Sequence, residues 1–373
     1  MTASPSAASP SSAAPTFPLT LGILGGGQLG RMLAFAAARL GHRVIVLDPA
    51  ADAPAGAVAE HLCAPYDDPT ALAELAERCD VVTYEFENIP VAAVETIGAD
   101  RVRPHPRALD VSADRLTEKQ HVASIGLQPA PFRAADDQAQ LEAAVGELAA
   151  EGHDRMVAKT RRLGYDGKGQ LRLAAGEVPG DAFEQLGGVP LVVEGFVDFD
   201  CEISVIAARA LDGTVRCFPP ARNEHRDGIL AVSEVPAGVD ADVVIAAQSA
   251  AKRLLGSLDY VGVLGLELFV TADGLLVNEF APRVHNSGHW SELASVTDQF
   301  EQHVRAVLGL PLGDPASLAC RMENLIGDDL DRTPDLLAVG DWRVHVYGKA
   351  EARPGRKMGH ATRLTGDGLQ LFR

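Results

Sequence analysis

Two glutamates on an apolar hairpin are the side chains of this sequence best suited to chemistry. The segments LGLELFV and LLVNEF read as strands joined at Ala272–Gly274, a three-residue turn with its glycine in the left-handed position. That register places Glu267 directly opposite Glu279, where two carboxylates repel unless a cation lies between them. A hard divalent ion, Mg²⁺ or Mn²⁺, prefers such oxygen ligands. The hairpin therefore predicts a metal site at Glu267 and Glu279.

Two alternatives for this hairpin stay open. A two-residue turn would give Glu267 a different partner and weaken the argument. The pair would also need no ion if it were solvated at a sheet edge. The neighbouring residues Leu266, Leu268 and Phe280 are too apolar for an exposed pair, which favours the metal site.

A loop rich in glycine and charge, KTRRLGYDGKGQ, spans residues 159–170. Lys159 ends a predicted strand, and the glycines that follow leave backbone N–H groups free to surround phosphates while the lysine supplies charge. The GxxxxGK[ST] pattern of a Walker A loop is absent. A long exposed hairpin is the alternative interpretation.

Polar donors are dense directly after the metal hairpin, in the segment Pro282–Trp290. Such a run after a strand is typical of an anion- or substrate-binding loop. Residues 223–226 and 353–357 are similar clusters, although each alone is more often a solvated surface run.

The turn GGGQLG at residues 25–30 follows a strand, precedes a helix and satisfies G-x-G-x-x-G. Asp48 ends the next strand, as in dinucleotide-binding folds, so NAD binding is one hypothesis. A tight strand-to-helix turn of any parallel sheet is the other.

The elements that must position these groups fall into two kinds of fold. Residues 18–50 read as strand, glycine turn, helix and strand, the opening of a parallel sheet, and a helix at 68–78 leads to the strand VVTYEF. Further along, short strands alternate with Gly and Pro turns around one helix at 240–256, which indicates an α+β layout with mostly antiparallel pairing. The end of the chain reads as a small β-rich domain.

Composition restricts the class of protein. The 373 residues predict two or three domains. A net charge of −18 argues against nucleic acid or a membrane as partner, but it permits small phosphorylated substrates. No apolar run reaches the roughly 18 residues of a membrane span, and the Ala/Ser/Pro-rich start lacks signal-peptide features. Five cysteines without a CxxC pair indicate neither a disulfide scaffold nor a zinc site. We expect a cytoplasmic protein.

Taken in order, the motifs resemble one family, the N5-carboxyaminoimidazole ribonucleotide synthetases, which are ATP-grasp ligases of purine biosynthesis. The matching stretches extend over nearly the whole chain from about residue 20 to 360 and are GGGQLGRML, YEFENI, DRLTEKQ, KTRRLGYDGKGQ, VEGFVDFDCEIS, NEHRDGIL, YVGVLGLELF, NEFAPRVHNSGHW and RPGRKMGH.

The resemblance implies a reaction and its ligands. ATP phosphorylates bicarbonate to carboxyphosphate, whose carboxyl group, or CO₂ released from it, is captured by the amine of 5-aminoimidazole ribonucleotide. Mg²⁺, with Mn²⁺ as a substitute, would be held by Glu267 and Glu279. A homodimer is also implied. Another ATP-grasp ligase and an NAD-dependent oxidoreductase are the alternatives.

The resemblance also assigns residues, by their matching positions. Those for ATP are Arg115, Lys159, Gly164, Tyr165, Asp166, Gly167, Lys168, Gly169, Gln170, Glu194, Gly195, Phe196, Val197, Glu202, His225, Asn278 and Glu279. Those for bicarbonate and the ribotide are Gln28, Leu29, Glu85, Tyr165, Arg283, His285, Asn286, Ser287, Lys349, Arg356 and Lys357. For catalysis, Arg283 and Lys349 would stabilise carboxyphosphate. Asp166 or His285 would take the amine proton.

The expected architecture is a three-domain ATP-grasp fold of mixed α/β and α+β class. It comprises a disordered extension (1–17), an N-terminal parallel α/β domain (18–112), an ATP-grasp domain (113–310) and a small β-rich C-terminal domain (311–373). Against the family pattern, residues 1–16 have no counterpart, and the chain stops soon after RPGRKMGH. On this interpretation the glycine turn serves the ribotide and Asp48 binds no NAD.

Overall fold

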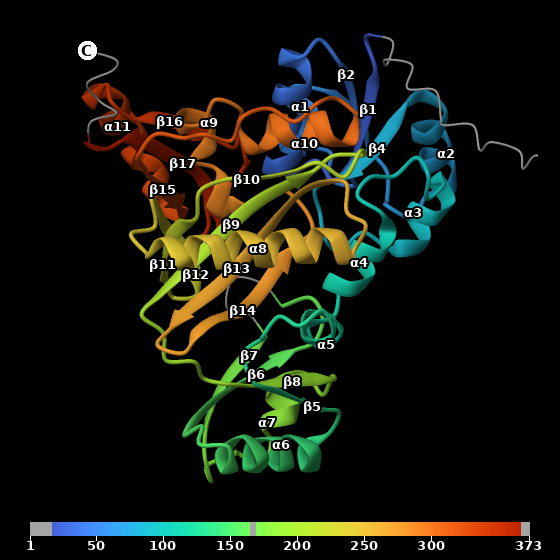
Figure 1. Ribbon diagram of the computed structural model, residues 1–373. Helices are drawn as coiled ribbons and strands as arrows, with labels where there is room; N and C mark the ends of the chain where they lie inside the picture. The colour runs from blue at the N-terminus through green and yellow to red at the C-terminus, as the bar shows by residue number, and fades with distance from the viewer. Residues whose placement is uncertain (1–16, 165–168, 367–373) are drawn as a thin grey trace, which may run out of the picture.

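The structure is a computed structural model, and it describes residues 17–164 and 169–366. Three sheets organise it (Figure 1). The first is parallel, with strand order β3-β2-β1-β4. Its elements are β1 (Thr20–Leu24), α1 (Gln28–Arg39), β2 (Arg43–Leu47), η1 (Pro54–Ala57), β3 (Glu60–Leu62), α2 (Pro69–Arg78), β4 (Val81–Tyr84), α3 (Val91–Ile97) and α4 (Pro106–Ser112). Strand β1 is buried throughout, as in a parallel sheet covered on both faces.

The second sheet is antiparallel, has the order β5-β8-β6-β7, and lies at the end of the molecule formed by the green segments of Figure 1. Helix α5 (Arg115–Ser124) leads to it. Its elements are β5 (Phe132–Ala135), α6 (Gln138–Ala150), β6 (Arg155–Thr160), β7 (Gln170–Ala174), α7 (Ala182–Gln185) and β8 (Leu191–Gly195).

The third sheet has nine strands in the order β14-β13-β9-β11-β12-β15-β17-β16, with β10 paired to β9. Its first part comprises β9 (Cys201–Arg209), β10 (Val215–Cys217), β11 (Ala221–Arg226), β12 (Ile229–Val235), α8 (Ala241–Ser257), β13 (Gly262–Thr271) and β14 (Gly274–Ala281). The remainder comprises η2 (Asn286–Gly288), α9 (Ser291–Ala294), α10 (Gln299–Val307), β15 (Cys320–Ile326), η3 (Gly327–Arg332), α11 (Thr333–Val339), β16 (Arg343–Val346) and β17 (Lys357–Leu364).

Helices cover both faces of this large sheet (Figure 1). On β9, Ile203, Val205 and Ala207 belong to the core beneath α8, whereas Ile206 and Ala208 belong to the core beneath α10. This alternation is the period of two expected for a strand buried on both faces. The sheet is therefore packed on both faces and supports the β13–β14 hairpin, which carries Glu267 and Glu279.

The predicted fold class is confirmed, with a parallel sheet first and antiparallel pairing afterwards. Among the strands of the described residues, sequence reasoning missed β3, β5, β11, β15 and β17. Segment β11, ARNEHR, reads as a solvated polar run, yet Ala221 and Asn223 are buried at every second position. Strands β15 to β17 extend the large sheet through β12, so no sheet edge marks residues 310–311. The domain boundaries stay a prediction.

Among the residues that the structure describes, no helix has the length and apolarity needed to cross a membrane. The predicted extension at 1–17 lies outside the described residues except for its last one.

Candidate active site

The hairpin β13–β14 brings the two predicted metal-binding glutamates together, although by a different register from the one expected. Thr271 pairs with Gly274, so the turn has two residues and the predicted three-residue turn is wrong. A β-bulge at Asn278 then adds one residue to β14, which restores Glu267 opposite Glu279. The predicted opposition is confirmed, and the bulge is its physical cause.

The two carboxylates differ in charge state. Burial raises the pKa of Glu267 well above its usual range, and the nearby carboxylates of Glu279 and Glu202 raise it further. Burial also opposes ionisation of Glu279, but Arg115, whose Nη1 lies 2.9 Å from Glu279 Oε2, outweighs it and lowers that pKa to about 2. A second positive charge beside Glu267 would relieve the remaining repulsion. The pair therefore fits a divalent cation.

Helix α5 presents three charged side chains to this hairpin at the spacing i, i+3, i+4, which places them on one face. Arg115 pairs with Glu279, and its Nη2 donates to the carbonyl of Gly164 at 2.9 Å. Glu118 accepts the backbone N–H of Phe280 at 2.6 Å, and Lys119 donates to the carbonyl of Asn278 at 3.3 Å. Burial raises the pKa of Glu118 to about 8. Sequence reasoning missed Glu118 and Lys119, although their spacing from Arg115 was a usable signal.

Glu194 on β8 joins the two lysines of this side of the site. Lys159 on β6 lies 2.9 Å from Glu194 Oε2, and Lys119 lies 3.2 Å from Oε1. Burial alone would raise the pKa of Glu194, but the two ammonium groups lower it to about 2. Two cations suited to phosphate are thus gathered beside β8, whose end is predicted to contact ATP.

Two further predicted nucleotide contacts, Glu202 and His225, lie next to Glu267. His225 Nδ1 is 3.1 Å from Glu202 Oε2. One ligand atom each of Glu202, His225 and Glu267 lies within 4.8 Å of the others. The large sheet causes this proximity, because β11 and β13 both pair with β9.

The glycine-rich turn is closed by the protein's own carboxylates. Gly26 N–H donates to Asp48 at 2.7 Å, and Gly27 N–H donates to Glu85 at 2.7 Å. Asp48 also accepts from Ala50 N and the Tyr66 hydroxyl, at 2.8 Å each. Both Asp48 oxygens therefore accept hydrogen bonds from the protein, which does not favour the NAD hypothesis.

Arg283, a predicted substrate residue just after β14, faces the segment that follows β4 of the first sheet. Arg283 Nη2 lies 2.7 Å from Glu87 Oε2, and Glu85 is close enough to interact with its charge. Burial raises the pKa of Glu85 to about 7. Burial, Arg283 and Lys357 together lower the pKa of His285 to about 3, so this imidazole is neutral near pH 7. Glu87, two residues after Glu85, is a partner that sequence reasoning missed.

Other predicted substrate residues contact protein groups. Asn286 exchanges two hydrogen bonds with Asn324 on β15, at 2.9 and 2.7 Å, and Asn324 is a further residue that sequence reasoning missed. Ser287 is buried, and its hydroxyl lies 2.9 Å from His285 Nδ1. Lys349 Nζ donates to the carbonyl of Lys357 at 2.6 Å, which brings these two together.

The remaining predicted positions are spread over several elements. Arg356 donates to the carbonyl of Glu351. Gln28 and Leu29 begin α1, and the Leu29 side chain is in the core. Gly195 ends β8, with Phe196 and Val197 half-buried after it. Gly164, Gly169 and Gln170 flank Tyr165, Asp166, Gly167 and Lys168, four residues that lie outside the described ones.

Comparisons with known proteins agree with this geometry. Three domain families match in order: the ribonucleotide synthetase preATP-grasp domain over residues 19–113, the ATP-grasp domain over 120–300, and the phosphoribosylaminoimidazole carboxylase C-terminal domain over 320–371. The N5-carboxyaminoimidazole ribonucleotide synthase of Brucella melitensis biotype 1 is 54% identical over 351 residues, which are 92% of this chain and 96% of that protein. The chain belongs to the N5-carboxyaminoimidazole ribonucleotide synthase family.

Solved N5-carboxyaminoimidazole ribonucleotide synthetases share the fold. The Thermus thermophilus synthetase superposes with a TM-score of 0.86 at 44% identity, over 94% of each chain. The Aspergillus clavatus synthase, solved with ADP and 5-aminoimidazole ribonucleotide, gives 0.83 at 30% identity, over 93% of this chain and 94% of that one. The resemblance read from the motifs is thus confirmed, and the oxidoreductase alternative is not supported.

Proposed function

We propose that this chain carboxylates 5-aminoimidazole ribonucleotide, using ATP and bicarbonate, and forms N5-carboxyaminoimidazole ribonucleotide, ADP and phosphate in purine biosynthesis. The observation that carries the proposal is that Glu279 and Arg283 lie close together in the chain, at the end of β14 and just after it. Glu279, held by Arg115, faces the nucleotide side, and Arg283, only four residues later, meets Glu85 and Glu87 of the first sheet. Both halves of the reaction therefore meet at the end of one strand.

Phosphoryl transfer to bicarbonate depends on position and charge rather than on a covalent catalyst. Lys159 and Arg115 are the cations for the ATP phosphates, and Glu194 and Glu279 hold them in place until the nucleotide binds. Glu267 and Glu279 would hold Mg²⁺, which supplies neutralisation of phosphate charge. This assignment rests on their direct opposition and on the raised pKa of Glu267.

The second step joins the amine nitrogen to the carboxyl carbon while phosphate leaves and the amine loses a proton. Arg283 and Lys349 are the cations proposed to stabilise the departing oxyanion. His285 is a weak proton acceptor because its pKa is lowered to about 3. Asp166 is the other acceptor expected from the sequence. Arg356 and Lys357 would hold the ribotide phosphate.

A homodimer and a cytoplasmic location are proposed on the family resemblance alone. Sedimentation at several protein concentrations tests the dimer, because a monomer at every concentration would exclude it.

The decisive experiment measures ADP release from Mg-ATP and bicarbonate, with and without the ribotide. We expect strong stimulation by the ribotide, with loss of at least about a hundredfold in Glu267→Gln and Glu279→Gln. Asp273→Asn, at the exposed turn of the same hairpin, is the matched control and should leave the rate unchanged. ATP binding without stimulation by the ribotide would instead indicate an ATP-grasp ligase with another acceptor. Near-normal turnover in Arg283→Ala would remove the electrostatic role of Arg283.

A further inference from the structure

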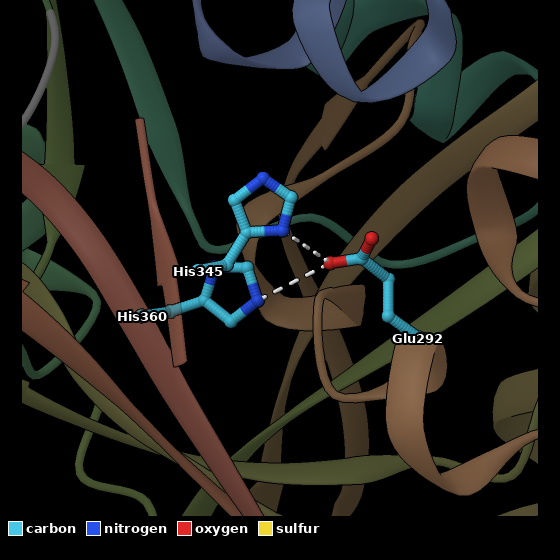
Figure 2. Close-up of side chains that lie close together, drawn as sticks. All are labelled: Glu292, His345 and His360. Carbon is cyan, nitrogen blue, oxygen red and sulfur yellow. Dashed lines mark ion pairs between the residues drawn. The ribbon is translucent and has the colours of Figure 1, made fainter. Parts of the chain in front are cut away.

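A second cluster of ligand-type side chains lies outside the site described above. Glu292 on α9 places one carboxylate oxygen 3.2 Å from His345 Nδ1 and 3.3 Å from His360 Nε2 (Figure 2). His345 on β16 and His360 on β17 are opposed in the antiparallel ladder, so their rings stack with centroids 5.3 Å apart. Three elements distant in sequence thus direct one carboxylate and two imidazoles at the same point.

The separations match a tetrahedral metal site. Ligand atoms that each lie about 2.0–2.1 Å from a zinc ion are about 3.3 Å from one another at tetrahedral angles. Both measured separations have this value, and the three ligand atoms lie within 4.8 Å of each other. A charge-assisted N–H···O hydrogen bond is shorter, about 2.7–2.9 Å. The contacts therefore suit an ion placed among the three groups.

The surroundings of His360 also fit a metal ligand. Its other nitrogen, Nδ1, lies 3.0 Å from the buried Tyr347 hydroxyl. When Nδ1–H donates to that hydroxyl, the lone pair of Nε2 is left for a metal, the outer arrangement usual for metal-binding histidines. The side chains of Glu292 and His345 keep 16% and 19% of their surface exposed, so the cluster is reached by solvent.

We propose that Glu292, His345 and His360 form a binding site for a divalent transition-metal ion, with Zn²⁺ as its preferred occupant. Two imidazoles and one carboxylate suit Zn²⁺ or Co²⁺ and discriminate against Mg²⁺, which prefers oxygen ligands in an octahedral shell. The bound ion would fasten α9, which follows the loop carrying His285, to the last two strands of the large sheet. The site is independent of the proposed reaction.

Metal titration of the full chain after chelator treatment tests this site. Co²⁺ should give the intense visible bands of a tetrahedral complex at one equivalent, and Zn²⁺ should abolish them. In Glu292→Gln the dissociation constant should rise by at least about tenfold, since loss of an outer-shell partner alone costs that much. Glu267→Gln is the matched control because it disables the proposed Mg²⁺ pair; it should keep the bands.

A second variant guards against a folding defect. His345→Asn should retain the far-UV circular dichroism of the parent and yet lose the Zn²⁺-dependent rise in melting temperature, which Glu267→Gln keeps. Equal Co²⁺ spectra and equal Zn²⁺ affinities in the parent and Glu292→Gln would overturn the proposal. So would bands that disappear only in Glu267→Gln.

Discussion

Replacing Glu118 by Gln should make the unliganded protein more stable, by an amount that grows with pH. Glu118 is buried and accepts the Phe280 N–H, a hydrogen bond that the amide oxygen of Gln can also accept. Burial, chiefly, raises the pKa of this carboxyl from 4.5 to about 8. Near pH 7 the unfolded chain ionises Glu118, whereas the folded chain holds it protonated. The parent therefore loses stability as pH rises from about 4.5 to 8.

The size of the effect follows from the pKa difference. One pKa unit corresponds to about 1.4 kcal/mol, so Glu118 costs about 3 kcal/mol at pH 7 and about 1 kcal/mol at pH 5. Glu118→Gln removes this cost. Urea unfolding at the two pH values, with chelator present, measures the gain. Glu95→Gln, on the exposed face of α3, is the control and should change stability by less than about 0.5 kcal/mol. A gain equal at both pH values, or a net loss at pH 7, would refute the reasoning.

Three further predictions concern the frame of the site. Gly30→Ala should destabilise the protein by about 1–3 kcal/mol, because its new methyl group would collide with the carbonyl of Gly25. Gly146→Ala, in open space on α6, is the control and should stabilise the protein by up to about 1 kcal/mol. Thermal unfolding of both variants compares the two effects. Lys119→Met should cost about 3 kcal/mol, because it removes one of the cations paired with a buried carboxylate; an unchanged urea midpoint would contradict this. Glu85→Gln should remove a titration step near pH 7 from the ribotide KM profile, because its carboxyl has a pKa of about 7; a step that persists would assign it to another group.

Much of the site could be predicted from local patterns. The hairpin followed from the turn between apolar runs, and the opposition of Glu267 and Glu279 was predicted from a three-residue turn. The turn length was not predictable in the same way. A bulge at Asn278 compensates for a two-residue turn, and bulges depend on the twist of the whole sheet rather than on local sequence.

The missed residues share another cause. Glu118, Lys119 and Glu87 act through partners on other elements, and Asn324 on β15 meets Asn286 from 38 residues away. Nothing near these residues in the sequence states which side chain they will face. The Glu292 cluster was missed for the same reason, since ligand spacing along one element cannot reveal three ligands from three elements.

Helix α5 presents Arg115, Glu118 and Lys119 to the β13–β14 hairpin, and its far end contacts α8. Near its end His121 meets Ser257 at 2.9 Å, and Arg253 of α8 donates to the carbonyl of Gly126 at 3.0 Å. The ten residues of this helix span about 15 Å. Because Arg115 begins this helix and the contacts with α8 lie at and just beyond its end, one short element joins α8 to the carboxylate of Glu279.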